Sequence, residues 1–315
     1  MPGLNGVVPR FKLILMVNPC ECGSSGFPRH MVFMRHMESE SALVHQLLTQ
    51  GVILDERLLE RVRARPDSAQ RLSERGPDQA KIVGQWIVRN LMEVYPELSD
   101  GFDAYRTSPY TRCKESAGEL GTPGFGPFKQ EVRLRERDRG EEGPLTQDEH
   151  RTRFPASAAR MAVNPFMWVP PHGESIDLVA TARVRSLLGM IRRQHEEEGR
   201  HSFFASTHGE LQLAAMAALY NWGPEEWAEE TVNPENRRHY GAILHLSTIN
   251  PNSGQAGGDF YMRLSNPLLS AEPGEWRPVA VPSYSPEELL EQAHRQERVF
   301  PPGMLTGLLN DSLPR

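Results

Sequence analysis

Two short apolar runs, each ending in a histidine, constrain the fold more than any other feature of this chain. Residues 31–34 lead directly into Arg35 and His36, and residues 202–206 lead into a second histidine, His208. Apolar residues at helical spacing follow that second histidine. Strand, polar turn and helix thus follow one another, and this alternation predicts an α/β fold with a mostly parallel sheet covered by helices on both faces.

The placement of the two histidines also indicates a binding site. In open α/β sheets, ligands bind at the carboxyl ends of the strands. A histidine there can act as a nucleophile, and an adjacent arginine can hold an anion with paired N–H donors. Gly209, directly after His208, would let the backbone approach a ligand closely. Taken alone, His36 fits a core histidine equally well; the second block favours a site for a phosphoryl group.

The composition excludes several classes of partner. With 38% hydrophobic and 24% charged residues, the 315-residue chain can build a sizeable core in one large or two small domains. Its net charge of -6 offers no basic surface for a nucleic-acid backbone. No run approaches the roughly 20 apolar residues that span a bilayer, and no clear signal sequence stands at the start. With only three cysteines, no disulfide framework is expected, and the expected location is cytoplasmic.

The patterning divides the chain into three parts. Residues 1–30, rich in Gly, Pro and Asn, are expected to form a poorly ordered extension, and residues 301–315 a tail. Residues 31–300 form the predicted catalytic domain. Within it, short helices over 40–70 and an irregular, charged stretch over 124–171 predict insertions that form a cap at the site.

Further elements follow from local patterns. Ser73 is expected to cap a helix that continues to Leu91. Residues 173–175 open another helix, a strand is predicted over 243–246, and a short helix over 286–294.

Phosphoryl transfer to a side chain needs a nucleophile, positive donors around the transferring oxygens and an acid for the leaving group. His36 is the predicted nucleophile. Arg35 and Arg112 would donate to the equatorial oxygens, and a protonated His208 would add positive charge there.

The predicted acid lies in a charged stretch. Residues 134–141 contain three carboxylates among arginines, and such a run is ordinarily a solvated surface. Leu134 indicates that the chain is anchored there, and Glu136, two residues later, falls on the same side of an extended segment. Glu136 is therefore the favoured proton donor.

Six short motifs occur in order along the chain. They are residues 35–39 (Arg-His-Met-Glu-Ser), 72–80 (Leu-Ser-Glu-x-Gly-x-x-Gln-Ala), 108–112 (Ser-Pro-x-x-Arg), 134–140 (Leu-x-Glu-x-x-x-Gly), 173–175 (Gly-Glu-Ser) and 207–210 (Thr-His-Gly-Glu). In this set the chain resembles the histidine phosphatase superfamily, the phosphoglycerate mutase-like enzymes. Its longer segments are similar to those of a bacterial, phosphatase-type branch of that family.

The resemblance implies a covalent phosphohistidine at His36, acid–base work by Glu136 and a third catalytic residue, His208. The phosphate-binding residues that it implies are Arg35, Arg112, His208 and Gly209. It implies neither a metal nor a cofactor, and the expected partner is a small phosphomonoester rather than nucleic acid or a membrane. It also implies a three-layer α/β/α sandwich with the insertions as a cap. The sequence leaves the substrate and the oligomeric state open.

Two residues depart from the family pattern. Met37 replaces the usual glycine beside the nucleophile, so its side chain must point away from the phosphate or narrow the pocket. Ala42 stands where many members place an asparagine that contacts phosphate. Phosphomonoester hydrolysis is the main hypothesis. A phosphoglycerate mutase-type phosphotransferase and a phospho-ligand-binding pseudoenzyme are the alternatives.

Overall fold

The computed structural model describes residues 26–121, 125–143, 145–278 and 284–294. The chain consists of two units, Met1–Ala280 and Val281–Arg315. In the second unit the one described element is helix α11 (Pro286–His294), at the residues predicted from the sequence. Most of the predicted extension and all of the predicted tail lie outside the described residues.

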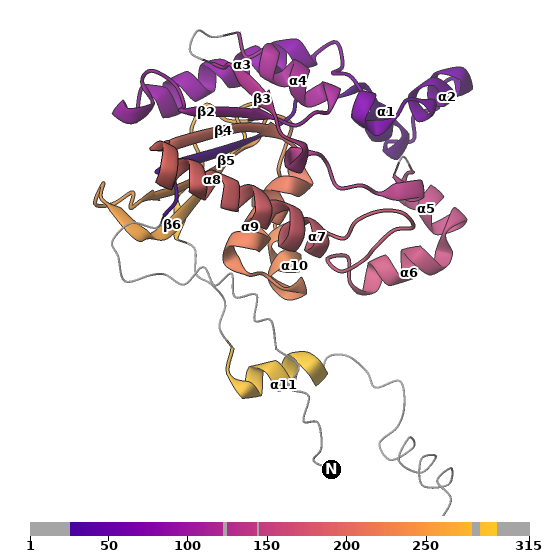
Figure 1. Ribbon diagram of the computed structural model, residues 1–315. Helices are drawn as coiled ribbons and strands as arrows, with labels where there is room; N and C mark the ends of the chain where they lie inside the picture. Colours follow the sequence, from indigo (N-terminus) through magenta and orange to yellow (C-terminus); the bar gives the residue numbers. More distant parts are fainter. Residues whose placement is uncertain (1–25, 122–124, 144, 279–283, 295–315) are drawn as a thin grey trace, which may run out of the picture. The chain divides into compact units, whose positions relative to one another are not determined.

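In the described part of the first unit, seven strands form one sheet in the order β3-β2-β4-β1-β5-β6-β7 (Figure 1). The strands are β1 (His30–Arg35), β2 (Ala104–Thr107), β3 (Phe128–Gln130), β4 (Ser202–Thr207), β5 (Ile243–Ile249), β6 (Ala256–Ser265) and β7 (Arg277–Pro278). β1 to β4 are mutually parallel. β5 runs antiparallel to β1, β6 antiparallel to β5, and β7 antiparallel to β6. β6 therefore has the same direction as β1 to β4, so the sheet is mostly parallel.

Alternation along the central strand β1 divides the core into two layers. Met31 and Phe33 belong to one cluster of buried residues, and Val32 and Met34 belong to the other, because successive side chains of a strand lie on opposite faces. All four are fully buried. A strand covered on both faces has no polar side, which explains the uninterrupted apolar run in the sequence.

Helices cover both faces of this sheet (Figure 1). One face carries α3 (Gly76–Ile87), its π-helical continuation η2 (Val88–Met92) and α4 (Thr111–Gly118). The other carries α7 (Ile176–Leu178), the π-helical segment η6 (Val179–Val184), α8 (Arg185–Glu198) and α9 (Gly209–Tyr220). These layers confirm the predicted α/β/α sandwich.

The two predicted cap segments contain most of the remaining elements. The first has α1 (Glu40–Thr49), α2 (Glu56–Ala64) and η1 (Asp67–Ala69), and the second has β3, η4 (Val132–Leu134), η5 (Gly140–Glu142), α5 (Gln147–Arg153) and α6 (Pro155–Val163). The short elements η3 (Pro96–Leu98), α10 (Pro224–Val232) and η7 (Pro234–Asn236) complete the described part of the unit. In Figure 1, α1, α2, α5 and α6 all lie to the right of the sheet. An Arg63–Glu149 ion pair joins α2 to α5. Within the described ranges, no helix is long and apolar enough to cross a membrane.

The structure corrects the predicted start of α3. Its first residue is Gly76, and Ser73 does not cap it. The Ser73 hydroxyl instead donates to Glu38 Oε1 (2.6 Å), and Arg75 also pairs with Glu38 (2.7 Å). The Ser73 side chain thus fixes Glu38, a residue of the first motif, instead of capping the helix.

Two other predictions were incomplete. Segment 124–171 is not wholly irregular, since it contains the edge strand β3 and helices α5 and α6. Strand β6, after residue 250, was not predicted at all. At the amino-terminal boundary, Phe27 is buried in the core and β1 begins at His30, so the described fold starts before residue 31.

Gly84 lies where α3 packs directly on backbone. A Cβ at this position would lie 2.1 Å from the carbonyl oxygen of Leu120, just beyond α4. Although alanine normally favours a helix, we expect Gly84→Ala to lower the free energy of unfolding by about 1–3 kcal/mol through overpacking. Denaturant titration measures the change.

Gly189 in α8 provides the matched control. A Cβ there would meet only Arg193 Nη1, at 3.8 Å. Gly189→Ala should therefore raise the free energy of unfolding by about 0.5–1 kcal/mol. Stabilisation by both substitutions would contradict the close approach of α3 to Leu120.

Candidate active site

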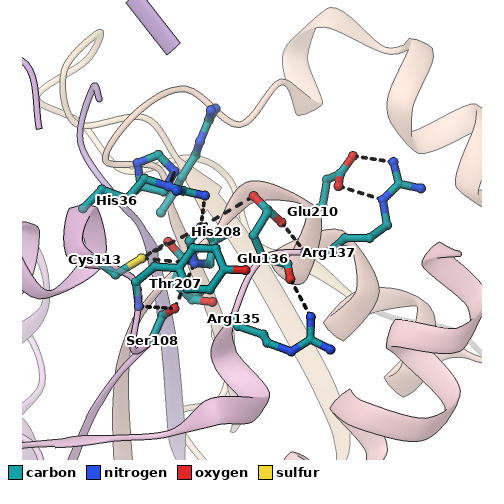
Figure 2. Close-up of polar contacts among 12 residues, drawn as sticks. His36, Ser108, Cys113, Arg135, Glu136, Arg137, Thr207, His208 and Glu210 are labelled. Atoms are coloured by element: carbon teal, nitrogen blue, oxygen red, sulfur yellow. Dashed lines mark hydrogen bonds and ion pairs between the residues drawn. The ribbon is translucent and has the colours of Figure 1, made fainter. Parts of the chain in front are cut away.

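The carboxyl ends of three parallel strands bring the predicted residues together (Figure 2). Arg35 ends β1 and pairs in register with Thr207, the last residue of β4. The His36 N–H donates to the Thr207 carbonyl (2.8 Å). Ser108 directly follows β2, and His208 directly follows β4. Both histidines therefore leave neighbouring strands at the same edge of the sheet.

His36 is buried and holds its Nε2 lone pair toward the guanidinium of Arg112. Its Nδ1 lies 2.6 Å from the Met37 carbonyl oxygen, so Nδ1 carries the proton and donates. Arg112 Nε donates to His36 Nε2 at 3.2 Å, which requires that Nε2 be unprotonated. Burial, followed by the charges of Arg112 and Arg35, holds the pKa of His36 well below its usual value. An unprotonated imidazole nitrogen is the form that acts as a nucleophile.

Arg112 lies in the first turn of α4, and its buried guanidinium lies between the two histidines. Nη2 is 3.4 Å from His208 Nδ1, and the Tyr110 ring covers the group, with its centre 5.0 Å from Cζ. The Asp67 carboxylate binds the end of the guanidinium at 3.0 and 3.1 Å. Burial alone would lower the pKa of Arg112, but nearby negative groups, Asp67 first, outweigh it and raise that pKa.

His208 precedes α9 and is fully buried. Its Nε2 is 3.0 Å from Ser108 Oγ, an oxygen that also accepts from the Tyr110 N–H (3.3 Å). Its Nδ1 lies 3.4 Å from Arg112 Nη2 and 3.5 Å from Glu136 Oε2. Burial, followed by the charge of Arg112, lowers the pKa of His208 well below its usual value. His208 is thus neutral in the free site, and a bound dianion would favour its protonation.

Arg35 is fixed by the loop before β5. Its Nη1 donates to the Arg238 carbonyl, and its Cζ lies 4.5 Å from the centre of the Tyr240 ring. Arg35 Nε is buried and has no hydrogen-bond partner among the described residues, so it is a donor open to an anion. Gly209 lies against this side chain: a Cβ there would be 3.4 Å from both Cδ and Nε of Arg35. A small side chain at position 209 would thus be in ordinary van der Waals contact with Arg35.

Glu136 is held beside His208 by its own loop. The Thr207 hydroxyl donates to the Leu134 carbonyl (2.9 Å), and the fully buried Leu134 anchors the segment as the sequence pattern indicated. Glu136 Oε1 accepts a hydrogen bond from the Arg137 N–H (3.0 Å). Burial, followed by the nearby Glu210 carboxylate, raises the pKa of Glu136 to about 7. A carboxyl that keeps its proton near neutral pH is suited to act as an acid.

The other two carboxylates of that stretch face elsewhere. Asp138 is exposed and accepts from the Gly140 N–H (2.8 Å). Glu141 pairs with the exposed His172 (3.5 Å). Of the three predicted alternatives, Glu136 is the one that the structure brings to the histidines.

Two glutamates hold the loop around Glu136 (residues 135–139, the acid loop) through ion pairs. Glu174 binds Arg135 (2.7 and 2.9 Å) and Arg183 (3.2 Å). Glu210 binds Arg137 through two hydrogen bonds (2.9 and 3.1 Å; Figure 2), and Arg139 joins the same carboxylate (2.6 Å). These arginines outweigh the effect of burial and lower the pKa of Glu210 to about 2, so it stays charged beside Glu136.

The charges at the site favour an anion. The side-chain ligand atoms of His36, Glu136 and His208 lie within 4.8 Å of one another, a spacing that would also suit a metal ion. Arg112, however, directs two N–H groups at the same histidines. A cation there would be repelled by this buried guanidinium, whereas an anion would be bound by it.

The departures from the family pattern have a structural account. The Met37 side chain is fully buried in the core cluster with Val83, and its sulfur lies close to Gly241. It therefore points away from the histidines and does not narrow the pocket. The Met37 N–H donates to Ser116 Oγ (2.9 Å) and is already engaged. Ala42 lies in α1, and its side chain offers no polar group.

Two site residues were missed in the sequence. Asp67 carries no motif and lies 45 residues before Arg112, so nothing local identifies it. Ser108 is part of a motif, but its contact with His208 spans 100 residues and depends on strand pairing. Cys113 follows Arg112 in α4, and its Sγ lies 3.3 Å from His208 Nε2. It is fully buried, and burial raises the pKa of its thiol to about 12.

The fold and the site together define a class: α/β sandwich proteins that gather two histidines, two arginines and a carboxyl of raised pKa at one edge of the sheet. The sequence pattern of the histidine phosphatase superfamily (branch 1) matches residues 31–238. The chain belongs to this superfamily. No curated protein matches the chain.

Solved structures share the fold at low sequence identity. Mycobacterial hydrolase 1 is 21% identical, covers 81% of this chain and 100% of its own, and has a TM-score of 0.51. Mycobacterial glucosyl-3-phosphoglycerate phosphatase Rv2419c with VO3 is 18% identical over 81% and 100% of the two chains (TM-score 0.51). The alpha-ribazole phosphatase from Shigella flexneri is 15% identical over 73% and 96% (TM-score 0.50).

The raised pKa of Glu136 has a consequence for stability. Between the ordinary carboxyl pKa of 4.5 and about 7, the unfolded chain loses the proton while the folded protein keeps it. Folding stability should therefore fall as pH rises through this window. We expect Glu136→Gln to be near neutral at pH 5 or below and to raise the free energy of unfolding by about 1–3 kcal/mol above pH 8.

Urea titrations at the two pH values measure this difference. Glu141→Gln, at an exposed carboxylate of the same stretch, is the control and should change stability by less than about 0.5 kcal/mol at either pH. An equal effect of Glu136→Gln at both pH values would show that the buried carboxyl titrates normally.

Proposed function

We propose that the protein is a phosphomonoester hydrolase that works through a covalent phosphohistidine on His36. The observation that carries the proposal is the unprotonated Nε2 of His36, which lies within hydrogen-bond distance of the buried Arg112. Glu136, with a pKa of about 7, and His208 lie beside it. A neutral nucleophile, a cationic anion-binding group and a protonated acid at one point match the needs of phosphoryl transfer.

The reaction takes two steps. His36 Nε2 attacks phosphorus, the bond from phosphorus to the leaving oxygen breaks, and Glu136 gives that oxygen its proton. Arg35, Arg112 and a protonated His208 hold the phosphoryl oxygens. In the second step Glu136, now ionised, takes a proton from water as the water oxygen attacks phosphorus. The phosphorus–nitrogen bond breaks, inorganic phosphate leaves, and His36 and Glu136 regain their starting protonation.

A small phosphorylated metabolite is the proposed substrate. Two structurally similar proteins are named as phosphatases of such compounds, glucosyl-3-phosphoglycerate and alpha-ribazole phosphate esters. The net charge of -6 supports a small-molecule substrate over nucleic acid, and the low cysteine content is in keeping with a cytoplasmic enzyme. No metal ion has a part in the proposed reaction.

His36→Ala should abolish turnover of phosphomonoesters. It removes the nucleophile while leaving Arg35, Arg112 and His208 in place. The wild type, quenched during turnover of a 32P-labelled aryl phosphate, should carry an acid-labile, base-stable label that His36→Ala lacks. His45→Ala, at an exposed histidine of α1, is the control and should keep both label and activity.

Other outcomes separate the alternatives. Unchanged hydrolysis by His36→Ala would exclude the phosphohistidine mechanism. Binding of orthovanadate without turnover of any compound in a phosphomonoester panel would establish a pseudoenzyme. Transfer of phosphate between two positions of a substrate, faster than its release, would establish a mutase.

Glu136→Gln tests the acid. Glu136 also serves the second step, so the phosphorylation step is compared through kcat/KM. Poor leaving groups depend on protonation, so kcat/KM for an alkyl phosphate should fall by about 10²–10⁴-fold. The kcat/KM for p-nitrophenyl phosphate, whose leaving group is a stable anion, should fall much less. In the wild type, the alkyl phosphate rate should decrease as pH rises above about 7, because the acid form of Glu136 is lost. Glu136→Gln should abolish this decrease above about pH 7. Equal losses of kcat/KM for both substrates would exclude Glu136 as the acid.

A further inference from the structure

The contact between Asp67 and Arg112 belongs to none of the six motifs. Asp67 opens η1, at the end of the first cap segment, and its side chain is 60% exposed, whereas that of Arg112 is 5% exposed. Its carboxylate meets the guanidinium with both oxygens, Oδ1 at 3.0 Å from Nη1 and Oδ2 at 3.1 Å from Nη2. A two-point pair of this kind fixes the plane of a guanidinium as well as its place.

The two edges of this guanidinium have different partners. Nε and Nη2 face the histidines, at 3.2 Å from His36 Nε2 and 3.4 Å from His208 Nδ1. Nη1 faces away from them, toward Asp67 Oδ1 and the Asp67 backbone carbonyl (2.7 Å). Because Asp67 binds the end of the guanidinium, the edge toward His36 is left for a phosphoryl group. Asp67 and the phosphoryl group can therefore bind Arg112 at the same time.

We propose that Asp67 is a positioning residue that holds Arg112 with its Nε edge toward the phosphoryl group on His36. The identity of that ligand rests on the proposed function. Without the Asp67 carboxylate, the guanidinium keeps the Tyr110 ring, the Asp67 backbone carbonyl and its contacts with the two histidines, but it loses the two-point ion pair that fixes its plane. Arg112 would then spend less time in the orientation that the transition state needs.

Asp67 connects the first cap segment to the guanidinium that would bind the phosphoryl group. Asp67 directly follows the α2 region, and Arg65, two residues earlier, pairs with Glu40 of α1 (2.6 Å). The same turn is thus bound at one point to the cap helices and at the next to the buried guanidinium. Arg65 and Glu40 are both exposed, so their ion pair adds little to the position of the turn, and the contacts of Asp67 itself fix Arg112.

Three variants test this role. Asp67→Asn keeps the shape and removes the charge and one acceptor, and Asp67→Glu keeps the charge on a longer side chain. Glu40→Gln is the matched control, since it breaks an ion pair of the same cap segment without contact with Arg112. Each is compared with wild type in hydrolysis of p-nitrophenyl phosphate and in inhibition by orthovanadate, with thermal unfolding to verify folding.

Asp67→Asn should raise the inhibition constant of orthovanadate by about tenfold or more. Bound orthovanadate mimics five-coordinate phosphorus, and a misaligned guanidinium weakens binding of this mimic more than binding of substrate. KM should rise less than that inhibition constant, and kcat should fall. Asp67→Glu should recover part of the loss, and Glu40→Gln should leave all three constants unchanged. If Asp67 had only a structural role, Asp67→Asn would lower the unfolding temperature, and the orthovanadate inhibition constant would rise no more than KM.

Two results would overturn the proposal while leaving the hydrolase reaction intact. Tighter orthovanadate binding by Asp67→Asn would show that the carboxylate competes with the anion for Arg112. Unchanged constants would show that the pair is an idle surface contact. Failure of the wild type both to bind orthovanadate and to turn over a phosphomonoester would instead remove the proposed function, and with it the role of Asp67.

Discussion

One buried guanidinium, that of Arg112, sets the properties of the groups around it. Its charge contributes to the low pKa of both His36 and His208, so both imidazoles are neutral in the free site. The same group offers the N–H donors that a phosphoryl group needs. Because burial of a cation is costly without a partner, Arg112 also requires a carboxylate, which Asp67 provides. The neutral state of His36, the proposed nucleophile, and the proposed binding of an anion therefore both depend on Arg112. A substitution of Arg112 would change both together.

Local signals in the sequence predicted the centre of the fold but not its edges. β1 is covered on both faces, so the run 31–34 is uninterrupted, and a covered strand of this kind can be recognised without any knowledge of its neighbours. The edge strand β3 (Phe128–Gln130) is three residues long and partly exposed, so it leaves no apolar run. β6 (Ala256–Ser265) begins at an irregular pairing with the end of β5, near Ile249, and its first residues include glycines that weaken a strand pattern.

The same distinction separates the site residues that could be predicted from those that could not. His36, Arg112, Glu136 and His208 lie in short motifs, and strand register brings them to one edge of the sheet. Asp67 has no motif, because its only distinguishing property is a partner 45 residues away. An aspartate in a loop is ordinarily a solvated residue, and only the tertiary structure shows that this one faces a buried cation. The roles of all these residues in catalysis stay predictions.

The two halves of the site are held by different forces. Backbone groups fix His36: its N–H donates to the Thr207 carbonyl, and its ring donates to the Met37 carbonyl. Ion pairs fix the acid loop, through Glu174 and Glu210 with their arginines, and several of these partners are partly exposed. Salt screens exposed ion pairs but scarcely affects buried backbone hydrogen bonds. Ionic strength should therefore act on the placement of Glu136 more than on that of His36, and thus on protonation of the leaving group more than on attack at phosphorus. The Asp67–Arg112 pair shares this sensitivity to salt, since one partner is exposed and the other is buried.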